Sequence, residues 1–205
     1  QGNIVFVGEK PDKPFPAGTT VIDGTGKTLI PGFVMLHEHM FYPTGQANYT
    51  EMLSSFPLLY LAGGTTTLRT AGTMNPYGDL NLKKAIENGT TAGPDIHVTA
   101  PYLEGPGLPI LKVKALRGVA DAERMVEYWA AEGATSYKAY MHIHANELKA
   151  VIAKAHQKGH HVTAHLCSVT YRQAATLGID NLEHGFFVAS DFVENKKPDA
   201  CPARK

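Results

Sequence analysis

Cysteine is scarce in this sequence of 205 residues, and so are the features of a membrane or nucleic-acid protein. The two cysteines, Cys167 and Cys201, are too few for a disulfide framework, and we expect Cys167 to pack as a small buried apolar residue. Lysine plus arginine balances aspartate plus glutamate at 19 each, so charge does not favour nucleic acid or an anionic membrane as a partner. No apolar run approaches the roughly 18 residues that span a bilayer. The compartment stays open.

The first 30 residues differ from the rest of the chain. Short β-type runs at residues 4–8 and 19–23 are separated by Pro11, Pro14 and Pro16, and a turn at residues 24–27 leads into a third run. Three strands are too few for an independent sandwich. We therefore expect residues 1–30 to be part of a small β-sandwich domain whose other strands lie outside this sequence.

From residue 31 onward, predicted strands alternate with predicted helices. After an apolar run at residues 28–35 that enters the first strand, further strands are expected at residues 65–69, 95–99, 135–140, 161–165 and 179–183. Apolar residues at i, i+3, i+4 and i+7 predict helices over 121–132 and 146–158. A helix near residues 50–62 contains Pro57, which predicts a kink.

This alternation predicts an α/β fold with a parallel sheet. Successive strand ends lie about 30 residues apart, close to the ~31 of a (β/α)₈ TIM-type barrel. No G-x-G-x-x-G follows any strand, which removes the usual dinucleotide-binding form of an open doubly wound sheet. We predict an incomplete (β/α)₈ barrel over residues 31–205, with about six βα units in this chain.

Histidines and one lysine recur where these strands end. His37 and His39 are two residues apart, so both project to the same side of a strand. Lys138 ends the fourth strand, His165 the fifth and His184 the sixth. Because active sites of such barrels lie at the carboxyl ends of the strands, we expect these five side chains to share one mouth.

Each residue also has a plainer interpretation. A chain with ten histidines contains an H-x-H pair by chance, and a second pair occurs at His142 and His144. His165 fits a core histidine, and His184 fits a turn. Lys138 in an apolar strand is harder to explain, since lysine is almost never buried unless it is paired. Because histidines and a lysine recur at the ends of several predicted strands, we favour a metal site over these plainer interpretations.

Lys138 needs chemistry of its own, because an ammonium group has no acceptor for a metal. Burial lowers the pKa of a lysine, and the free amine reacts with carbon dioxide to give a carbamate. This carbamate would bridge two divalent metal ions, one held by His37 and His39 and the other by His165 and His184. Zinc is the default metal. Two such ions share a hydroxide nucleophile and polarise a carbonyl.

The sequence resembles the amidohydrolase superfamily of metal-dependent hydrolases. Residues 26–33 leading into His37-Glu38-His39 resemble its first-strand signature, and residues 62–67 its second-strand segment. Residues 133–138, 159–165 and 178–185 resemble its fourth, fifth and sixth strands, the fourth with its carbamylated lysine. Residues 1–30 are similar to the small β-domain that precedes the barrel. The motifs are most similar to the prolidase-like and imidazolonepropionase-like branch.

The resemblance also implies an aspartate at the end of an eighth strand, as metal ligand and general base. Only 21 residues follow His184, too few for two more βα units, and we do not assign Asp191 to this role. We therefore expect that the C-terminal portion of the barrel is missing here, that this chain alone is inactive, and that its open edges make it poorly stable.

The resemblance implies a hydrolase that cleaves an amide-type C–N bond, in a peptide or an N-acyl amino acid, by a metal-bridging hydroxide. Hydrolysis of a lactone, ester, urea or carbamate stays open, as does a non-catalytic relative that keeps the barrel, and a homo-oligomer is compatible with either. His142 is a candidate catalytic residue for the oxyanion or a substrate carboxylate, although a solvent-facing loop histidine fits as well. Tyr140, His144 and Arg69 are candidate contacts for a small-molecule substrate, and Arg69 fits a structural salt bridge equally.

Overall fold

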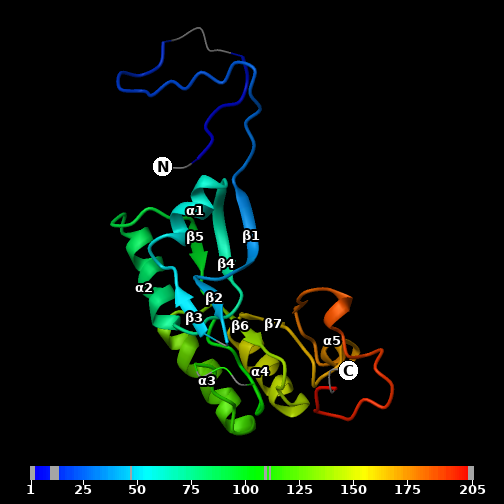
Figure 1. Cartoon of the computed structure of the whole chain (residues 1–205). Helices are drawn as coiled ribbons and strands as arrows, with labels where there is room; N and C mark the ends of the chain where they lie inside the picture. Colours follow the sequence, from blue (N-terminus) through cyan, green and yellow to red (C-terminus); the bar gives the residue numbers. More distant parts are fainter. Residues whose placement is uncertain (1–2, 10–13, 47, 109, 111, 203–205) are drawn as a thin grey trace. The chain divides into compact units, whose positions relative to one another are not determined.

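The computed structural model describes residues 3–9, 14–46, 48–108, 110 and 112–202 (Figure 1). The chain divides into two units, Gln1–Pro31 and Gly32–Lys205. The described part of the first unit contains no strand, so the three strands expected there are not present. Its apolar side chains, such as Val5 and Leu29, are exposed. A β-type run needs a neighbouring strand to pair with its backbone N–H and C=O groups. A local sequence pattern does not specify that neighbour.

The second unit is built on parallel strands that follow one another in chain order. They form two three-stranded sheets, and parallel bridges from Thr99 to Ser136 and from Leu103 to Ala139 connect the segment after the first sheet to the second. This is the α/β arrangement that the alternating pattern predicts. The strands are β1 Phe33–Glu38, β4 Thr65–Thr70 and β5 Asp95–His97, followed by β6 Ser136–Ala139, β7 His161–Ala164 and β8 Asn181–Leu182.

The first strand begins later than predicted. The run at residues 28–35 enters β1 only at Phe33, whose N–H donates to the Gly64 carbonyl at 2.9 Å. Pro31 has no N–H to contribute to such a ladder. At Gly32 a Cβ would lie 2.1 Å from Thr66 Oγ1, so only glycine allows the approach to β4.

Helices cover the second unit between the strands: α1 Phe56–Ala62, α2 Pro76–Glu87, α3 Val119–Glu132, α4 Ala145–Gln157 and α5 Tyr171–Thr176, with a 3-10 turn η1 at Phe186–Val188. The two helices with one apolar face, α3 and α4, lie within two residues of their predicted bounds and pack side by side (Figure 1). Val126 and Val151 are fully buried on these faces. Gly133 ends α3 at φ 107°, in the left-handed region that favours glycine.

The helix predicted over residues 50–62 is wrong in its first half. Residues Phe41–Gly45 and Asn48–Glu51 form the antiparallel hairpin β2–β3 instead, and α1 starts at Phe56. Pro57 lies in the first turn of α1, where its missing N–H costs nothing, so it helps to start the helix and does not kink it.

The segment after η1 is tied to the loops at the carboxyl ends of β6 and β7. Cys201 forms a disulfide with Cys167, with 5.0 Å between their Cα atoms, so the expectation of an isolated buried Cys167 is wrong. Asp199 Oδ1 accepts the Ala145 N–H at 2.7 Å at the start of α4. Asp191 accepts two N–H groups at the start of α5, at 2.8 and 3.0 Å. Asp191 therefore caps a helix, in agreement with its exclusion as the general base.

Two parts of the second unit leave large apolar side chains exposed. Val34 and Leu36 on β1 are exposed, and so are Phe186, Phe187 and Phe192 around η1. Exposed apolar surface of this kind favours association with other protein surfaces. Low stability of this chain by itself therefore remains our prediction, and a cooperative melt would contradict it. Within the described residues, no helix has the length and apolarity to cross a bilayer.

Candidate metal centre

The structure brings the predicted ligands together at the carboxyl ends of the parallel strands. His37 lies in β1 and His39 follows it, with 5.4 Å between their ring centroids. His184 follows β8, 4.7 Å from His37 and 4.5 Å from His165, which follows β7. Lys138 of β6 is 1% exposed. Residues separated by up to 147 positions in sequence thus form one cluster, as the strand-end rule requires.

Two of the histidines are oriented through one ring nitrogen. His37 Nδ1 donates to Glu183 Oε2, and His39 Nδ1 donates to the Gly72 carbonyl at 3.1 Å. Both acceptors lack a hydrogen, so the Nδ1 atoms carry the protons and each Nε2 keeps a lone pair. Metal-bound histidines have this arrangement, in which a carboxylate or backbone carbonyl fixes the tautomer from behind.

Lys138 is buried without a hydrogen bond of good geometry. Its Nζ lies 3.2 Å from Glu183 Oε1, which makes an ion pair, yet no acceptor in the described residues meets the angular criteria of a hydrogen bond. Burial lowers the pKa of Lys138 to about 8, although the charge of Glu183 opposes the shift. Near neutral pH this side chain is therefore still mostly an ammonium, with a minor fraction present as free amine.

Glu183 is the functional residue that the sequence analysis missed. It is 5% exposed and accepts from Arg69 at 3.0 Å in addition to its contacts with His37 and Lys138. Arg69 lies in β4 and Lys138 in β6, and Glu183 directly follows β8, so the three side chains come from alternate strands, like one layer inside a barrel. The signal was available, because a buried lysine requires a carboxylate partner and Glu183 ends the last strand.

The charges around Glu183 set its ionisation. Burial acts to raise the pKa of Glu183, but the hydrogen bond from His37 and the charge of Lys138 outweigh it and lower the pKa well below its usual range. Glu183 is therefore a carboxylate at neutral pH.

Three histidines of the cluster have lowered pKa values. Burial lowers the pKa of His39 to about 4, although its hydrogen bond to Gly72 acts in the opposite direction. Burial and the neighbouring His184 lower the pKa of His165 to about 4. Burial and the charge of Lys138 also lower the pKa of His184. Neutral imidazole is the form that binds metals, so these rings need no deprotonation before they act as ligands.

Two of the predicted substrate contacts lie next to the cluster. The Tyr140 ring is 5.0 Å from His165 and 4.7 Å from Tyr102, which in turn lies 6.4 Å from His39. Arg69 reaches the cluster through its ion pair with Glu183, so the structural interpretation of this residue is correct. Tyr140 therefore remains available for a substrate, while Arg69 is occupied.

The second H-x-H pair does not join the cluster. His142 Nδ1 lies 3.6 Å from Oε1 of Glu104, a buried residue on the loop after β5. Burial raises the pKa of Glu104, although the His142 N–H and charge oppose the shift. His144 is the N-cap of α4, and its backbone N–H donates to Glu147 Oε2 at 3.0 Å. His144 was predicted to bind substrate, and its position as the N-cap of α4 gives it an alternative, structural role.

The residues present fit a metal centre only if Lys138 takes part in it. In the described ranges, no three His, Cys, Asp or Glu side chains are arranged to hold an ion by themselves. The cluster instead consists of two pairs of histidines, with the buried amine of Lys138 held beside Glu183 at 3.2 Å. A ligand added at Lys138 would complete both pairs at once.

Comparisons with known proteins agree with this arrangement. The sequence profile of the amidohydrolase family matches residues 28–192, so the chain belongs to the amidohydrolase family. Dihydroorotase of Mycobacterium tuberculosis is 36% identical over 78 residues, which are 38% of this chain and 17% of that enzyme. The chain thus covers only a small part of this curated relative.

Solved structures share the fold. A candidate prolidase from Bifidobacterium longum superposes with a TM-score of 0.68 at 25% identity, over 85% of this chain and 44% of that one. Ochratoxinase from A. niger superposes with a TM-score of 0.60 at 19% identity, over 74% of this chain and 47% of that one. The chain spans about half the length of these proteins.

Proposed function

We propose that this chain carries the metal-binding part of a hydrolase that cleaves an amide-type C–N bond, with a peptide or an N-acyl amino acid as substrate. We further propose that its parallel strands belong to an eight-stranded (β/α) barrel. The observation that carries the proposal is Lys138, a nearly fully buried amine that lies among the histidines and whose ion pair with Glu183 lacks good hydrogen-bond geometry within the described residues. The names of the relatives, a dihydroorotase and a candidate prolidase, support this class of reaction.

In this proposal His37 and His39 hold one divalent ion and His165 and His184 a second, with a carbamate on Lys138 between them. The free amine of Lys138 would add carbon dioxide and lose one proton to give the carbamate, whose oxygens could serve as the metal ligands that the ammonium form lacks. When bound, the two ions supply an activated water and polarise the substrate carbonyl.

The other residues of the cluster have positioning roles. Glu183 and the Gly72 carbonyl fix the tautomers of His37 and His39, so that both Nε2 atoms face the same space. Arg69 supplies a positive charge beside Glu183, which keeps that carboxylate compensated once Lys138 is no longer cationic. The Tyr140 ring lies 5.0 Å from His165, which supports the proposal that its hydroxyl meets a polar group of the substrate.

The test is the metal content of the purified chain, measured by mass spectrometry after growth with zinc and bicarbonate. We expect about two zinc ions per chain from the two-metal arrangement, and fewer than one for Lys138→Ala. Lys149→Ala, which alters an exposed lysine of α4, is the matched control and should bind as the parent does. One ion per chain, unaffected by Lys138→Ala, would replace the bridged site with a mononuclear one.

Activity of the full-length protein decides the substrate class. We expect hydrolysis of dipeptides or N-acyl amino acids to exceed hydrolysis of lactones, esters and carbamates on matched panels. Faster lactone turnover would assign the same centre to C–O bonds. Two bound zinc ions without any turnover would support the non-catalytic relative.

A further inference from the structure

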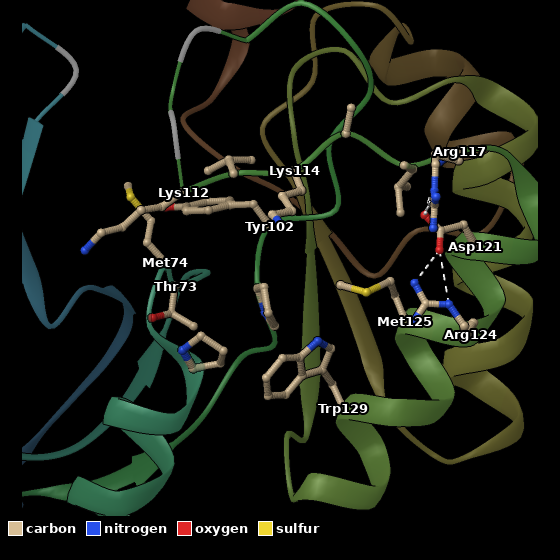
Figure 2. Close-up of a pocket in the computed structure, with 15 residues that line it drawn as sticks. Thr73, Met74, Tyr102, Lys112, Lys114, Arg117, Asp121, Arg124, Met125 and Trp129 are labelled. Atoms are coloured by element: carbon tan, nitrogen blue, oxygen red, sulfur yellow. Dashed lines mark hydrogen bonds and ion pairs between the residues drawn. The ribbon is translucent and has the colours of Figure 1, made fainter.

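A cavity lies beside the histidine cluster. It encloses about 540 Å³ between the start of α2, the helix α3 and residues 112–117. Figure 2 shows Trp129 and Met125 of α3 on one side of this cavity, with Tyr102 and Lys114 across from them. This volume is within the usual range of sites for small molecules.

The floor of the cavity is apolar and aromatic. Trp129 and Tyr102 are largely buried, and Met125 is half-buried and packs against the core. Pro76 and Pro101 complete this surface, and neither has an N–H group that would need a partner. Rigid rings of this kind stack on a flat aromatic or aliphatic group.

The rim of the cavity is cationic. Four positive side chains, Lys112, Lys114, Arg117 and Arg124, line it against a single carboxylate, Asp121. Asp121 is shared by the two arginines, with Arg124 at 2.5 Å and Arg117 at 3.9 Å, as the dashed lines in Figure 2 indicate. One acid therefore does not neutralise this rim.

The two lysines differ in their partners. Lys112 pairs with Glu51 at 3.4 Å on β3, outside the cavity. Lys114 has no ion-pair or hydrogen-bond partner in the part of the chain that the structure describes, although it stands beside Tyr102. An ammonium group next to an aromatic floor fits the carboxylate of a ligand whose apolar part lies on the rings.

We propose that this cavity is a binding site for a small aromatic carboxylate. The carboxylate meets Lys114 and the rim arginines, and the apolar body packs on Trp129, Met125 and Tyr102. This site is separate from the metal centre, because no histidine of the cluster lines it. Tyr102 is shared by both, and Thr73 of the cavity wall follows Gly72, whose carbonyl orients His39. The proposal does not depend on the proposed hydrolase activity.

Trp129 is the single tryptophan of the chain, so its fluorescence reports on this cavity alone. The experiment titrates the 205-residue chain with 4-phenylbutyrate and with its neutral isostere 4-phenylbutyramide, by fluorescence and by calorimetry. We expect saturable binding of the carboxylate with a Kd below about 1 mM and binding of the amide weaker by about tenfold, the scale of a charge-assisted hydrogen bond.

Two variants locate the binding site. Lys114→Gln should weaken binding of the carboxylate by about threefold to tenfold and leave the amide unchanged. Met125→Ala should weaken both ligands, and Lys149→Gln neither. Equal affinities for carboxylate and amide, an unchanged Kd in Lys114→Gln, or no calorimetric binding below 1 mM would each overturn the proposal.

Chelator treatment separates this site from the metal centre. The zinc-loaded chain and the chelator-treated chain should bind 4-phenylbutyrate with the same Kd, and so should Lys138→Ala. Binding that disappears with the metal would place the carboxylate on the metal centre and refute the cavity site, without bearing on the proposed hydrolase.

Discussion

Histidines and carboxylates gather at both ends of the parallel strands, but the two groups differ in burial. At the carboxyl ends, Glu183 is 5% exposed among His37, Lys138 and Arg69. At the amino ends, Asp180 is 27% exposed and pairs with His161, which is 75% exposed. The same residue types therefore make a candidate metal centre in one place and a surface ion pair in the other. The two groups differ because the carboxyl-end group is buried and includes a buried lysine whose contact with Glu183 lacks good hydrogen-bond geometry.

The amino-end group joins two strands and holds no free ligand. Asp180 accepts the Val162 N–H at 2.7 Å, and its two oxygens also contact His156 at 3.0 Å and His161 at 3.2 Å. Burial acts to raise the pKa of Asp180, but these hydrogen bonds outweigh it and lower the pKa. Both oxygens of the carboxylate thus already accept hydrogen bonds from groups of the chain.

The largest effect is expected for Glu183→Gln. In metal-free, bicarbonate-depleted buffer this change leaves the buried Lys138 and Arg69 without their carboxylate, and breaking one partner of a buried pair costs about 3–5 kcal/mol. The free energy of unfolding of the full-length protein, from urea denaturation, should fall by this amount. Glu87→Gln on α2, which is exposed and only pairs with Lys83, is the control. A loss below about 1 kcal/mol would place Glu183 among ordinary surface pairs.

A second carboxylate tests what burial does without a partner. Asp79 of α2 is 1% exposed, and neither of its oxygens has a hydrogen bond within the described residues. Burial raises its pKa from 3.8 to about 7, although Thr73 acts to lower it. Asp79 and Glu183 are therefore both buried, but only Glu183 has cations beside it, and their pKa values shift in opposite directions.

This contrast predicts a pH-dependent gain in Asp79→Asn. Because the pKa of Asp79 is higher in the folded chain than in the unfolded chain, its contribution to stability is present below about pH 4 and is lost as the pH rises toward 7. The asparagine variant carries no charge and avoids this loss. Its free energy of unfolding should exceed that of the parent by about 2–4 kcal/mol at pH 8 and match it at pH 4. Equal differences at both pH values would show that Asp79 has a cation partner in solution.

The sequence predicted the cluster better than its surroundings. The positions of His37, His39, Lys138, His165 and His184 followed from strand ends alone, because a parallel sheet places those ends on one edge. The alternation of side chains along a strand and the spacing between successive strands are local properties, so a single sequence is enough to recognise them.

The parts that were not predicted depend on contacts between distant residues. The hairpin β2–β3 takes up the first two residues of the predicted helix, and Phe41 of this hairpin is buried in the fold. Cys167 and Cys201 are 34 residues apart, and only the path of the segment after η1 brings them together. Residues 4–8 have the composition of a strand, but a strand needs a neighbour that composition does not specify.

The smallest effect is expected at the amino ends, for Asp180→Asn. The asparagine amide still accepts the Val162 N–H, so the change removes only the negative charge of Asp180 that faces the two exposed histidines. Such surface pairs contribute about 0–1 kcal/mol. The lowered pKa of Asp180 places its contribution above about pH 4, with loss as the pH falls further. Urea denaturation should show a decrease below about 1 kcal/mol at pH 6 and none at pH 3, with zinc content unchanged. His161→Gln removes one of the two partners and should cost less than Asp180→Asn. A loss as large as that of Glu183→Gln would mean that both ends of the strands depend on buried charge, and would remove the distinction on which the metal centre is assigned.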